Sequence, residues 1–477
     1  MSTLKTFFKD TIIYGLATVL PRLMNFVLVP LHTDTLDTAS YSDNTYFYVY
    51  AAFFNVLLTY GMETAFFRFF SKSDIKAKVF STTLISLSVT TVVVFGLVFI
   101  FNQQISESLG LRLDYFNYLA GVIALDTLVV APFAYLRATG KPIKFTAIKL
   151  SNIAIYVALN FFFLWAVPKF GIAISGYDKS DLVKYIFISN IAASAFTLIL
   201  LSPYFFKTKL VFDKAILKQM LNYSWPIMVA GLAYVINENF DKWILPQLLD
   251  KNINGAYAGC YKIAVFMTIF IQAFRLGAEP FFFNHAKEKN AKQTYATIMK
   301  YFVVFGSLML LFIVAYLDIF KVLIVRDESY WIALDIIPIV LLANLCLGIY
   351  FNLAIWYKLT DKTRYGMYIS IVGAIITIAF NMLLIPKFGF IAAAWATLLA
   401  YLSMVVISYV LGQKHYKVPY DVFRVLLYLF LGAGLSFLIY HNTYIKANYY
   451  LSTTILLAFF TFIIVLERNE IKQLLKR

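Results

Sequence analysis

The chain has 477 residues, of which 61% are hydrophobic, 18% aromatic and only 14% charged. This balance excludes an ordinary water-soluble domain and indicates a protein embedded in lipid. The net charge of +16 does not require a nucleic acid partner, because no predicted loop is long enough to present a folded basic module.

Apolar segments of roughly spanning length follow one another along the chain, and each could cross a bilayer as a helix. We count fourteen, at about 11–31, 45–67, 79–101, 115–136, 145–167, 184–206, 221–245, 254–281, 298–320, 331–357, 365–385, 389–411, 421–440 and 449–466. The first lacks a small-residue cleavage site, so we expect a retained helix rather than a signal peptide. The predicted fold class is an all-α polytopic membrane protein.

Basic residues alternate sharply between successive predicted loops. One set of loops holds 27 of the 41 Lys and Arg residues, and the other set holds eight. Cytoplasmic loops retain an excess of Lys and Arg, so this asymmetry predicts that both termini are cytoplasmic. The basic inner loops would contact anionic membrane lipids, which accounts for the net charge.

The first half of the chain recurs in the second half. Arg22 to Arg68 aligns with Glu238 to Asn284 at a constant offset of 216 residues, without a gap. Identical pairs at this offset include Pro30 and Pro246, Tyr41 and Tyr257, Gly61 and Gly277, and Glu63 and Glu279. Further along, Pro168-Lys169-Phe170-Gly171 recurs as Pro386-Lys387-Phe388-Gly389, and Arg137-Ala138-Thr139-Gly140-Lys141 resembles Lys358-Leu359-Thr360-Asp361-Lys362.

This duplication predicts two parallel six-helix repeats followed by two additional helices. We expect an N-lobe over residues 1–210, a C-lobe over 211–412, and a terminal helix pair with a cytoplasmic tail over 413–477. Parallel repeats of this kind are typical of secondary transporters, whose substrate path runs between the halves.

Polar and charged side chains inside the spans are costly in hydrocarbon and are therefore the candidate substrate-binding residues. They share one face of helix one, two, seven or eight, and comprise Arg22 and Asn25, Glu63, Glu238, Asp241 and Lys242, and Gln272, Arg275 and Glu279. For Arg22 and Glu238 the alternative is a fixed ion pair, and for Glu63 and Glu279 it is helix-end capping or interhelical hydrogen bonding. Asp126 is interpreted as structural, with Lys149 as a neighbour.

The sequence lacks the motifs that are typical of metal sites, nucleotide-binding loops and interfacial enzymes. The four His residues lie far apart and the two Cys residues fall within predicted spans, so we predict no metal site and no cofactor. No phosphate-binding loop is present, and the outer loops are too short to carry an interfacial enzyme site. We therefore predict a transporter rather than an enzyme, with H⁺ or Na⁺ as the candidate coupling ion.

The fourteen helices, the duplication, the Arg in helix one, the stretch from Tyr60 to Phe69 and the Pro-Lys-Phe-Gly turns resemble polysaccharide-transporter flippases. That family belongs to the multidrug, oligosaccharidyl-lipid and polysaccharide exporter superfamily. The resemblance implies two six-helix lobes that open alternately inward and outward. It also implies an undecaprenyl-diphosphate-linked sugar as substrate, for O-antigen, capsule or exopolysaccharide assembly at the bacterial inner membrane.

The resemblance implies a cationic cavity, in which Arg22, Lys242 and Arg275 would hold the diphosphate. A monomer would suffice for this mechanism. A polysaccharide polymerase and other assembly proteins are the expected partners. Two other substrates stay open. An ion-coupled antiporter of organic cations would use the carboxylates of helices seven and eight. A lipid II flippase would share the diphosphate and the tail. The terminal helix pair either forms a groove for the polyprenyl tail or simply packs laterally.

Overall fold

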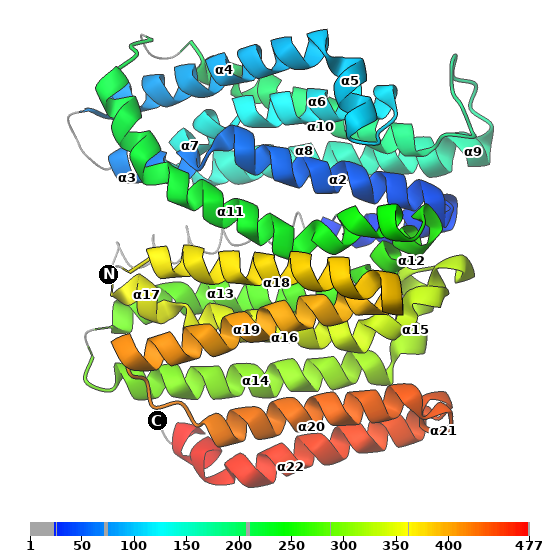
Figure 1. Ribbon diagram of the computed structural model, residues 1–477, viewed down its shortest axis with the longest axis vertical. Helices are drawn as coiled ribbons and strands as arrows, with labels where there is room; N and C mark the ends of the chain where they lie inside the picture. The colour runs from blue at the N-terminus through cyan, green and yellow to red at the C-terminus, as the bar shows by residue number, and fades with distance from the viewer. Residues whose placement is uncertain are drawn as a thin grey trace. The chain divides into compact units, whose positions relative to one another are not determined.

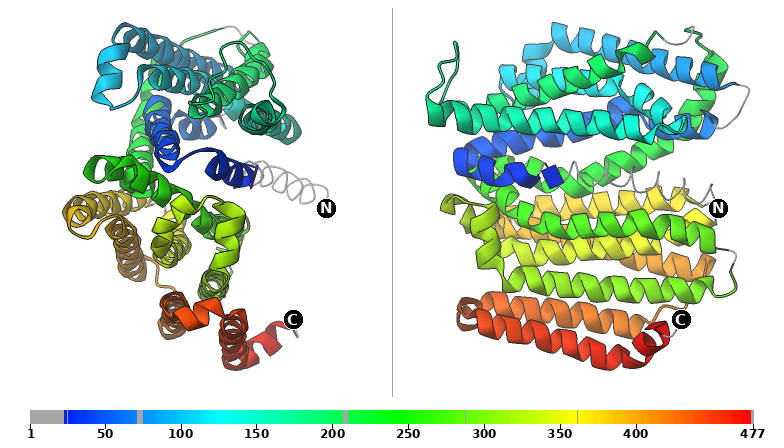
Figure 2. Two further views of the ribbon diagram at one scale, coloured as in Figure 1. Left: turned by 90° about the vertical axis from the view of Figure 1, so that its right-hand side faces the viewer. Right: turned by 180° about the vertical axis from the view of Figure 1, so that it is seen from behind.

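The computed structural model describes residues 23–24, 26–70, 75–206, 210–286, 288–360 and 362–475. Every regular element in these ranges is helical, and no β-strand occurs among them. The chain divides into two compact units, Met1–Gly255 and Ala256–Arg477. Figures 1 and 2 show the helices of each unit packed lengthwise against one another.

The first helical residues described in the first unit are 23–24 and 26–35. Its further elements are α2 (Thr38–Thr59), α3 (Met62–Phe70), α4 (Lys76–Ile100), α5 (Asn102–Ser108), α6 (Leu113–Leu128), α7 (Val130–Ala138), α8 (Pro142–Phe161), η2 (Phe162–Ala166), α9 (Val167–Phe170), α10 (Val183–Leu201), η3 (Ser202–Tyr204) and α11 (Lys214–Leu248). α12 (Lys251–Tyr261) crosses the boundary between the units.

The second unit contains the remaining elements. They are η4 (Lys262–Ala264), α13 (Val265–His285), α14 (Ala291–Ala315), α15 (Leu317–Ile324), η5 (Glu328–Ile336), α16 (Ile337–Leu353), α17 (Ile355–Leu359), α18 (Arg364–Phe388), α19 (Ile391–His415), α20 (Val422–His441), α21 (Thr443–Ala447) and α22 (Tyr449–Leu475).

Local sequence explains where several helices begin and end. α2 begins after Asp37, whose carboxylate accepts a hydrogen bond from the Ser40 amide at 2.7 Å, and α11 begins after Asp213 in the same way. The two Pro-Lys-Phe-Gly copies end α9 and α18, with Gly171 at φ +60° and Gly389 at φ +69°. Glycine adopts positive φ without a Cβ penalty, so the duplicated motif is a helix-stop signal in both units.

Eleven helical segments among the described residues are long and apolar enough to span a membrane. They correspond to eleven of the fourteen predicted spans, which confirms a multi-pass membrane protein. The first predicted span, 11–31, lies largely outside the described residues. The second and seventh, 45–67 and 221–245, are helical as α2–α3 and α11 but do not meet the same criterion. Both carry charged residues of the predicted substrate-binding set, and the total of fourteen spans stays a prediction.

Packing in the first unit joins α11 to the N-terminal helices. α11 contacts α2, α3 and α4, and α2 also contacts α6 and α10. A core of fully buried side chains from α3, α4, α7 and α11, including Phe66, Phe80, Leu136 and Met220, packs these helices together. α11 lies in the predicted second repeat, so the compact unit extends beyond the proposed N-lobe boundary at residue 210.

In the second unit, α16 packs on α19, α18 packs on α19, and α14 packs on both terminal helices, α20 and α22. Figure 2 shows α20 and α22 side by side along α14. The terminal pair is therefore an integral part of this unit rather than a loosely tethered hairpin.

Candidate functional site

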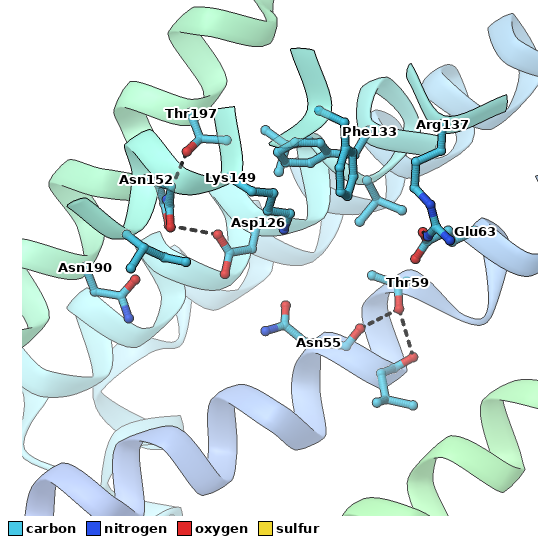
Figure 3. Close-up of a pocket in the computed structure, with 16 residues that line it drawn as sticks. Asn55, Thr59, Glu63, Asp126, Phe133, Arg137, Lys149, Asn152, Asn190 and Thr197 are labelled. Atoms are coloured by element: carbon cyan, nitrogen blue, oxygen red, sulfur yellow. Dashed lines mark hydrogen bonds and ion pairs between the residues drawn. The ribbon is translucent and has the colours of Figure 1, made fainter. Parts of the chain in front are cut away.

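A polar cavity of about 650 Å³ lies within the first unit, between α2, α3, α6, α7, α8 and α10. Figure 3 shows its side chains pointing toward one another from these helices. The lining residues are Asn55, Val56, Thr59, Glu63, Asp126, Val129, Val130, Phe133, Arg137, Phe145, Lys149, Asn152, Ile153, Asn190, Ser194 and Thr197. Two basic and two acidic side chains thus meet inside one helical bundle.

Hydrogen bonds hold the side chains at one end of this cavity. Ser194 Oγ donates to Asp126 Oδ1 at 2.8 Å, and Asn152 Nδ2 donates to Thr197 Oγ1 at 2.9 Å. Asn190 Nδ2 donates to the hydroxyl of Tyr48 at 3.0 Å. Each amide keeps further hydrogen-bonding capacity, because an Asn side chain offers two donor hydrogens and an acceptor oxygen. This end presents oriented polar groups with capacity to spare.

Lys149 is the least satisfied charge in the cavity. Its ammonium lies 4.4 Å from the centroid of the Phe133 ring, and it makes no hydrogen bond or ion pair with any residue in the described part of the chain. The predicted neighbourhood with Asp126 is confirmed, since both line one cavity, but the carboxylate accepts from Ser194 instead of pairing with Lys149. An ammonium in a membrane-embedded bundle without a bonded counter-charge is costly, which points to a role in binding.

At the other end of the cavity, Glu63 of α3 pairs with Arg137 of α7. Arg137 Nη1 donates to Glu63 Oε1 at 2.8 Å, and the guanidinium also lies over the Phe67 ring at 4.8 Å. The pair is half-exposed, with 44% of the Arg137 side chain and 47% of the Glu63 side chain accessible. It joins α3 to α7 along the cavity lining.

The second unit contains a matching pair, formed by Glu279 of α13 and Lys358 of α17 at 2.8 Å. Glu279 is the duplicate of Glu63, and Lys358 is the residue that the sequence alignment places opposite Arg137. The duplication has therefore preserved an interhelical carboxylate–cation pair in both units. Both carboxylates thus make interhelical hydrogen bonds, which is one of the alternatives to substrate binding for Glu63 and Glu279. Their contact with a substrate stays a prediction.

The two units differ one turn away from this pair. Arg275 stands four residues before Glu279, donates to it at 3.2 Å, and lies 4.0 Å from the Phe351 ring centroid. The duplicate position in the first unit is Thr59, whose hydroxyl donates to the backbone carbonyl of Asn55 in the same helix. Gln272, another candidate, is half-buried on α13. The second unit thus carries an extra cation where the first unit lines its cavity with a small hydroxyl side chain.

The candidates on α11 form a compact charged group. Lys242 Nζ donates to Asp241 Oδ1 at 3.0 Å and to the Glu238 carbonyl at 2.9 Å. Only 10% of the Lys242 side chain and 3% of the Asp241 side chain are exposed. Arg22 and Asn25 lie outside the described residues, so the substrate-binding role of the whole predicted set stays a prediction.

Sequence reasoning missed most of the cavity, although its spacing was readable. Asn190, Ser194 and Thr197 are spaced i, i+4 and i+7 on α10, and this spacing places them on one helical face. Lys149 and Asn152 lie three residues apart on α8 and share a face in the same way. These two faces meet α2 only in the folded protein, so the spacing within each helix does not predict the cavity.

Comparison with known proteins identifies the family. The family model "Polysaccharide biosynthesis protein" matches residues 7–282, and the MatE model matches residues 226–383. No curated protein matches the chain significantly.

Among solved structures, the chain is similar to the lipid II flippase MurJ in an inward closed conformation. The TM-score is 0.74 at 16% identity, over 96% of this chain and 100% of that one. It is also similar to the Vibrio cholerae MATE transporter VcmN, with a TM-score of 0.62 at 15% identity over 87% and 97% of the two chains. A third similarity is to the MATE multidrug transporter DinF-BH, with a TM-score of 0.63 at 14% identity over 87% and 96%. These likenesses establish a shared fold, and the family match shows that the chain belongs to the polysaccharide biosynthesis protein family, whose members are multi-pass membrane transporters and not enzymes.

Proposed function

We propose that this protein translocates a polyprenyl-diphosphate-linked oligosaccharide across a bacterial inner membrane by alternating access. The observation that carries the proposal is a charged, hydrogen-bonding cavity inside a membrane-embedded bundle, in a chain of the polysaccharide biosynthesis family. A lipid-linked sugar is polar at one end and apolar at the other. Only its polar end needs a protein path, because the polyprenyl tail can remain in lipid throughout.

The diphosphate is the most costly part of the substrate to move through hydrocarbon. In this proposal Arg22, Lys242 and Arg275 bind it, since guanidinium and ammonium groups form charge-assisted hydrogen bonds to phosphate oxygens. Asp241 and Glu279 already hold Lys242 and Arg275, so these carboxylates would stabilise the cations when no substrate is bound. No covalent bond changes, and a gradient of H⁺ or Na⁺ or a downstream reaction supplies the driving force.

Fourteen helices in two parallel six-helix repeats would rock against each other, while the terminal pair α20 and α22 would guide the tail. The protein would act as a monomer with both termini in the cytoplasm, and would pass its substrate to a polymerase and other assembly proteins.

Two other substrates are favoured by specific observations. The similarity to MATE transporters, together with Glu238 and Asp241 on α11, favours an ion-coupled antiporter of organic cations. The similarity to MurJ favours lipid II, which has the same diphosphate and a related tail. Both alternatives share the fold and differ in what the polar groups bind.

The decisive experiment measures translocation of a fluorescent undecaprenyl-diphosphate-linked sugar in proteoliposomes. Wild type, Arg22→Ala and Glu238→Ala would be compared with Lys169→Ala, which removes a cation that stacks on Trp165 away from the cavity. We expect Arg22→Ala to abolish translocation and Lys169→Ala to retain it. Full activity in Arg22→Ala would remove the proposed diphosphate site. Efflux of an organic cation that depends on Glu238, without lipid translocation, would establish the antiporter instead.

A further inference from the structure

The cavity of the first unit contains groups that the proposed diphosphate site does not use. None of its sixteen lining residues belongs to the cationic set Arg22, Lys242 and Arg275. Its own charged groups are Lys149 and Arg137, balanced by Asp126 and Glu63. This cavity offers a diphosphate two cations, one of them paired with Glu63, against three in the proposed diphosphate site.

The same balance disfavours an organic cation. The ammonium of Lys149 lies in the cavity without an ion pair among the described residues, and it would repel a second cation at short range. What the cavity does offer is an alternation of donors and acceptors. Lys149 donates only, Asp126 accepts only, and the amides of Asn55, Asn152 and Asn190 can do both.

Hydroxyl groups match this alternation, because each hydroxyl donates one hydrogen bond and can accept others. Apolar walls complete the site. Phe133 and Phe145 meet edge to face with centroids 5.3 Å apart, and Val56, Val129, Val130 and Ile153 line the surface beside them. Ligand pockets typically combine such apolar walls with a few fixed polar groups, and a sugar ring presents apolar C–H faces as well as hydroxyls. The volume of about 650 Å³ lies within the ordinary range for small-molecule sites.

We infer that this cavity binds a sugar ring of the lipid-linked substrate, separately from the site that binds its diphosphate. Lys149 donates to a ring hydroxyl, or to a carboxylate where the ring carries one. Asp126 and the neighbouring amides receive and donate the remaining hydroxyl hydrogen bonds. This inference rests on the proposed function for the origin of the sugar, but binding to the cavity can be measured without any transport.

The cavity can be probed directly by cysteine protection. Thr59→Cys places a thiol on the lining with little change in volume, and the native Cys260 and Cys346 are buried. Labelling of Thr59→Cys by a methanethiosulfonate reagent would be timed in detergent, with glucose, N-acetylglucosamine or glucuronate added. Inorganic pyrophosphate and tetramethylammonium represent the two competing ligand classes. Ala77→Cys, an exposed position outside the cavity, is the matched control.

We expect a sugar to slow labelling of Thr59→Cys about threefold at twice its Kd, since only the empty site reacts, and to leave Ala77→Cys unchanged. Glucuronate should protect at lower concentration than glucose, and Lys149→Met combined with Asp126→Asn should remove protection by both. Lys144→Met, on the same helix but outside the cavity, should not. The inference would be overturned if only pyrophosphate or tetramethylammonium protected the thiol. It would also be overturned if about 50 mM sugar gave no protection, because this concentration is well above the millimolar Kd expected of so small a ligand.

A second measurement separates this inference from the proposed function. In proteoliposomes, bare undecaprenyl diphosphate should inhibit wild type and the Lys149→Met/Asp126→Asn variant equally, because it lacks the sugar. Translocation of the sugar-linked lipid should fall at least tenfold in the variant. If the bare lipid no longer inhibited the variant, the cavity would bind the diphosphate rather than the sugar. Absence of any lipid translocation by wild type would refute the proposed function while leaving the sugar-protection result standing.

Discussion

Gly61 occupies a backbone position that other residues would strain. Its φ is +69°, and a Cβ at this position would lie 2.8 Å from the carbonyl oxygen of Ser224 on α11. Its duplicate, Gly277, sits inside the continuous helix α13, where a Cβ would meet nothing within 4 Å among the described residues. The same glycine has therefore been retained twice in the sequence, while only the first copy is required by packing.

This difference predicts opposite effects of one substitution. Gly61→Ala should destabilise the protein by about 1–3 kcal/mol, because it combines a left-handed backbone with a backbone clash. Gly277→Ala should be neutral, or stabilising by up to about 1 kcal/mol, through its higher helix propensity. Thermal unfolding in detergent, followed with a thiol-reactive dye, suits the chain because Cys260 and Cys346 are buried until it unfolds. Equal melting temperatures for the two variants would contradict this account.

The Glu63–Arg137 pair should matter more for transport than for stability. Both side chains are half-exposed, and exposed ion pairs typically contribute about 0–1 kcal/mol. Reversing either charge alone would place like charges side by side in the cavity lining, so Glu63→Arg and Arg137→Glu should each reduce translocation at least tenfold. The double reversal should restore most of it, with all three variants melting near wild type. A double reversal no better than the single variants would show that transport does not depend on this ion pair.

At the scale of whole elements, the terminal helices are fastened by a buried charge network. Lys300 of α14 donates at 2.6 Å to both Glu467 and Glu470 of α22, and Arg424 of α20 donates to Glu467 at 3.1 Å. Tyr428 of α20 donates to the same Glu467 carboxylate. The network therefore links α14, α20 and α22. Lys300 and Glu467 are almost fully buried, so leaving either one unpaired would be costly.

Removing one partner should therefore loosen the terminal pair. Glu467→Ala removes the fully buried carboxylate of this network, leaves Lys300 with the half-exposed Glu470 and deprives Tyr428 of its acceptor, and it should cost about 3 kcal/mol. Glu470→Ala, at a side chain 42% exposed, should cost far less. The double variant Lys300→Met/Glu467→Leu should recover much of the loss, because no buried charge remains. Melting temperatures in detergent test the order, and a Glu470→Ala variant as unstable as Glu467→Ala would refute it.

The sequence predicts individual elements better than their convergence. The apolar run over Lys76–Ile100 is readable as a span because its length alone satisfies the bilayer. The apolar run at 221–245 is also readable as a span, although α11 carries Glu238, Asp241 and Lys242 and does not meet the stricter spanning criterion. The cavity depends on Lys149 and Asn190 meeting from α8 and α10. That meeting is set by interhelical packing, which periodicity within one helix does not encode.

For the molecule as a whole, duplication followed by divergence is the main organising feature. The pairs Glu63–Arg137 and Glu279–Lys358 keep one interaction in both units, whereas Thr59 and Arg275 differ at duplicate positions. Two related halves can therefore share a framework and bind different parts of one substrate. In our proposals the first unit binds the sugar, and Arg275 in the second helps to bind the diphosphate.

The direction of transport depends on topology, which the basic loops predict. With 27 Lys and Arg residues on one side and eight on the other, the side bearing Arg137 and Lys141 should be cytoplasmic. A membrane-impermeant maleimide should label Ser180→Cys, in the exposed loop before α10, on intact spheroplasts. Ala77→Cys should react only after permeabilisation. The reverse pattern would place the half-exposed Glu63–Arg137 pair on the outer side, away from a lipid-linked sugar made in the cytoplasm, and would contradict outward translocation through this cavity.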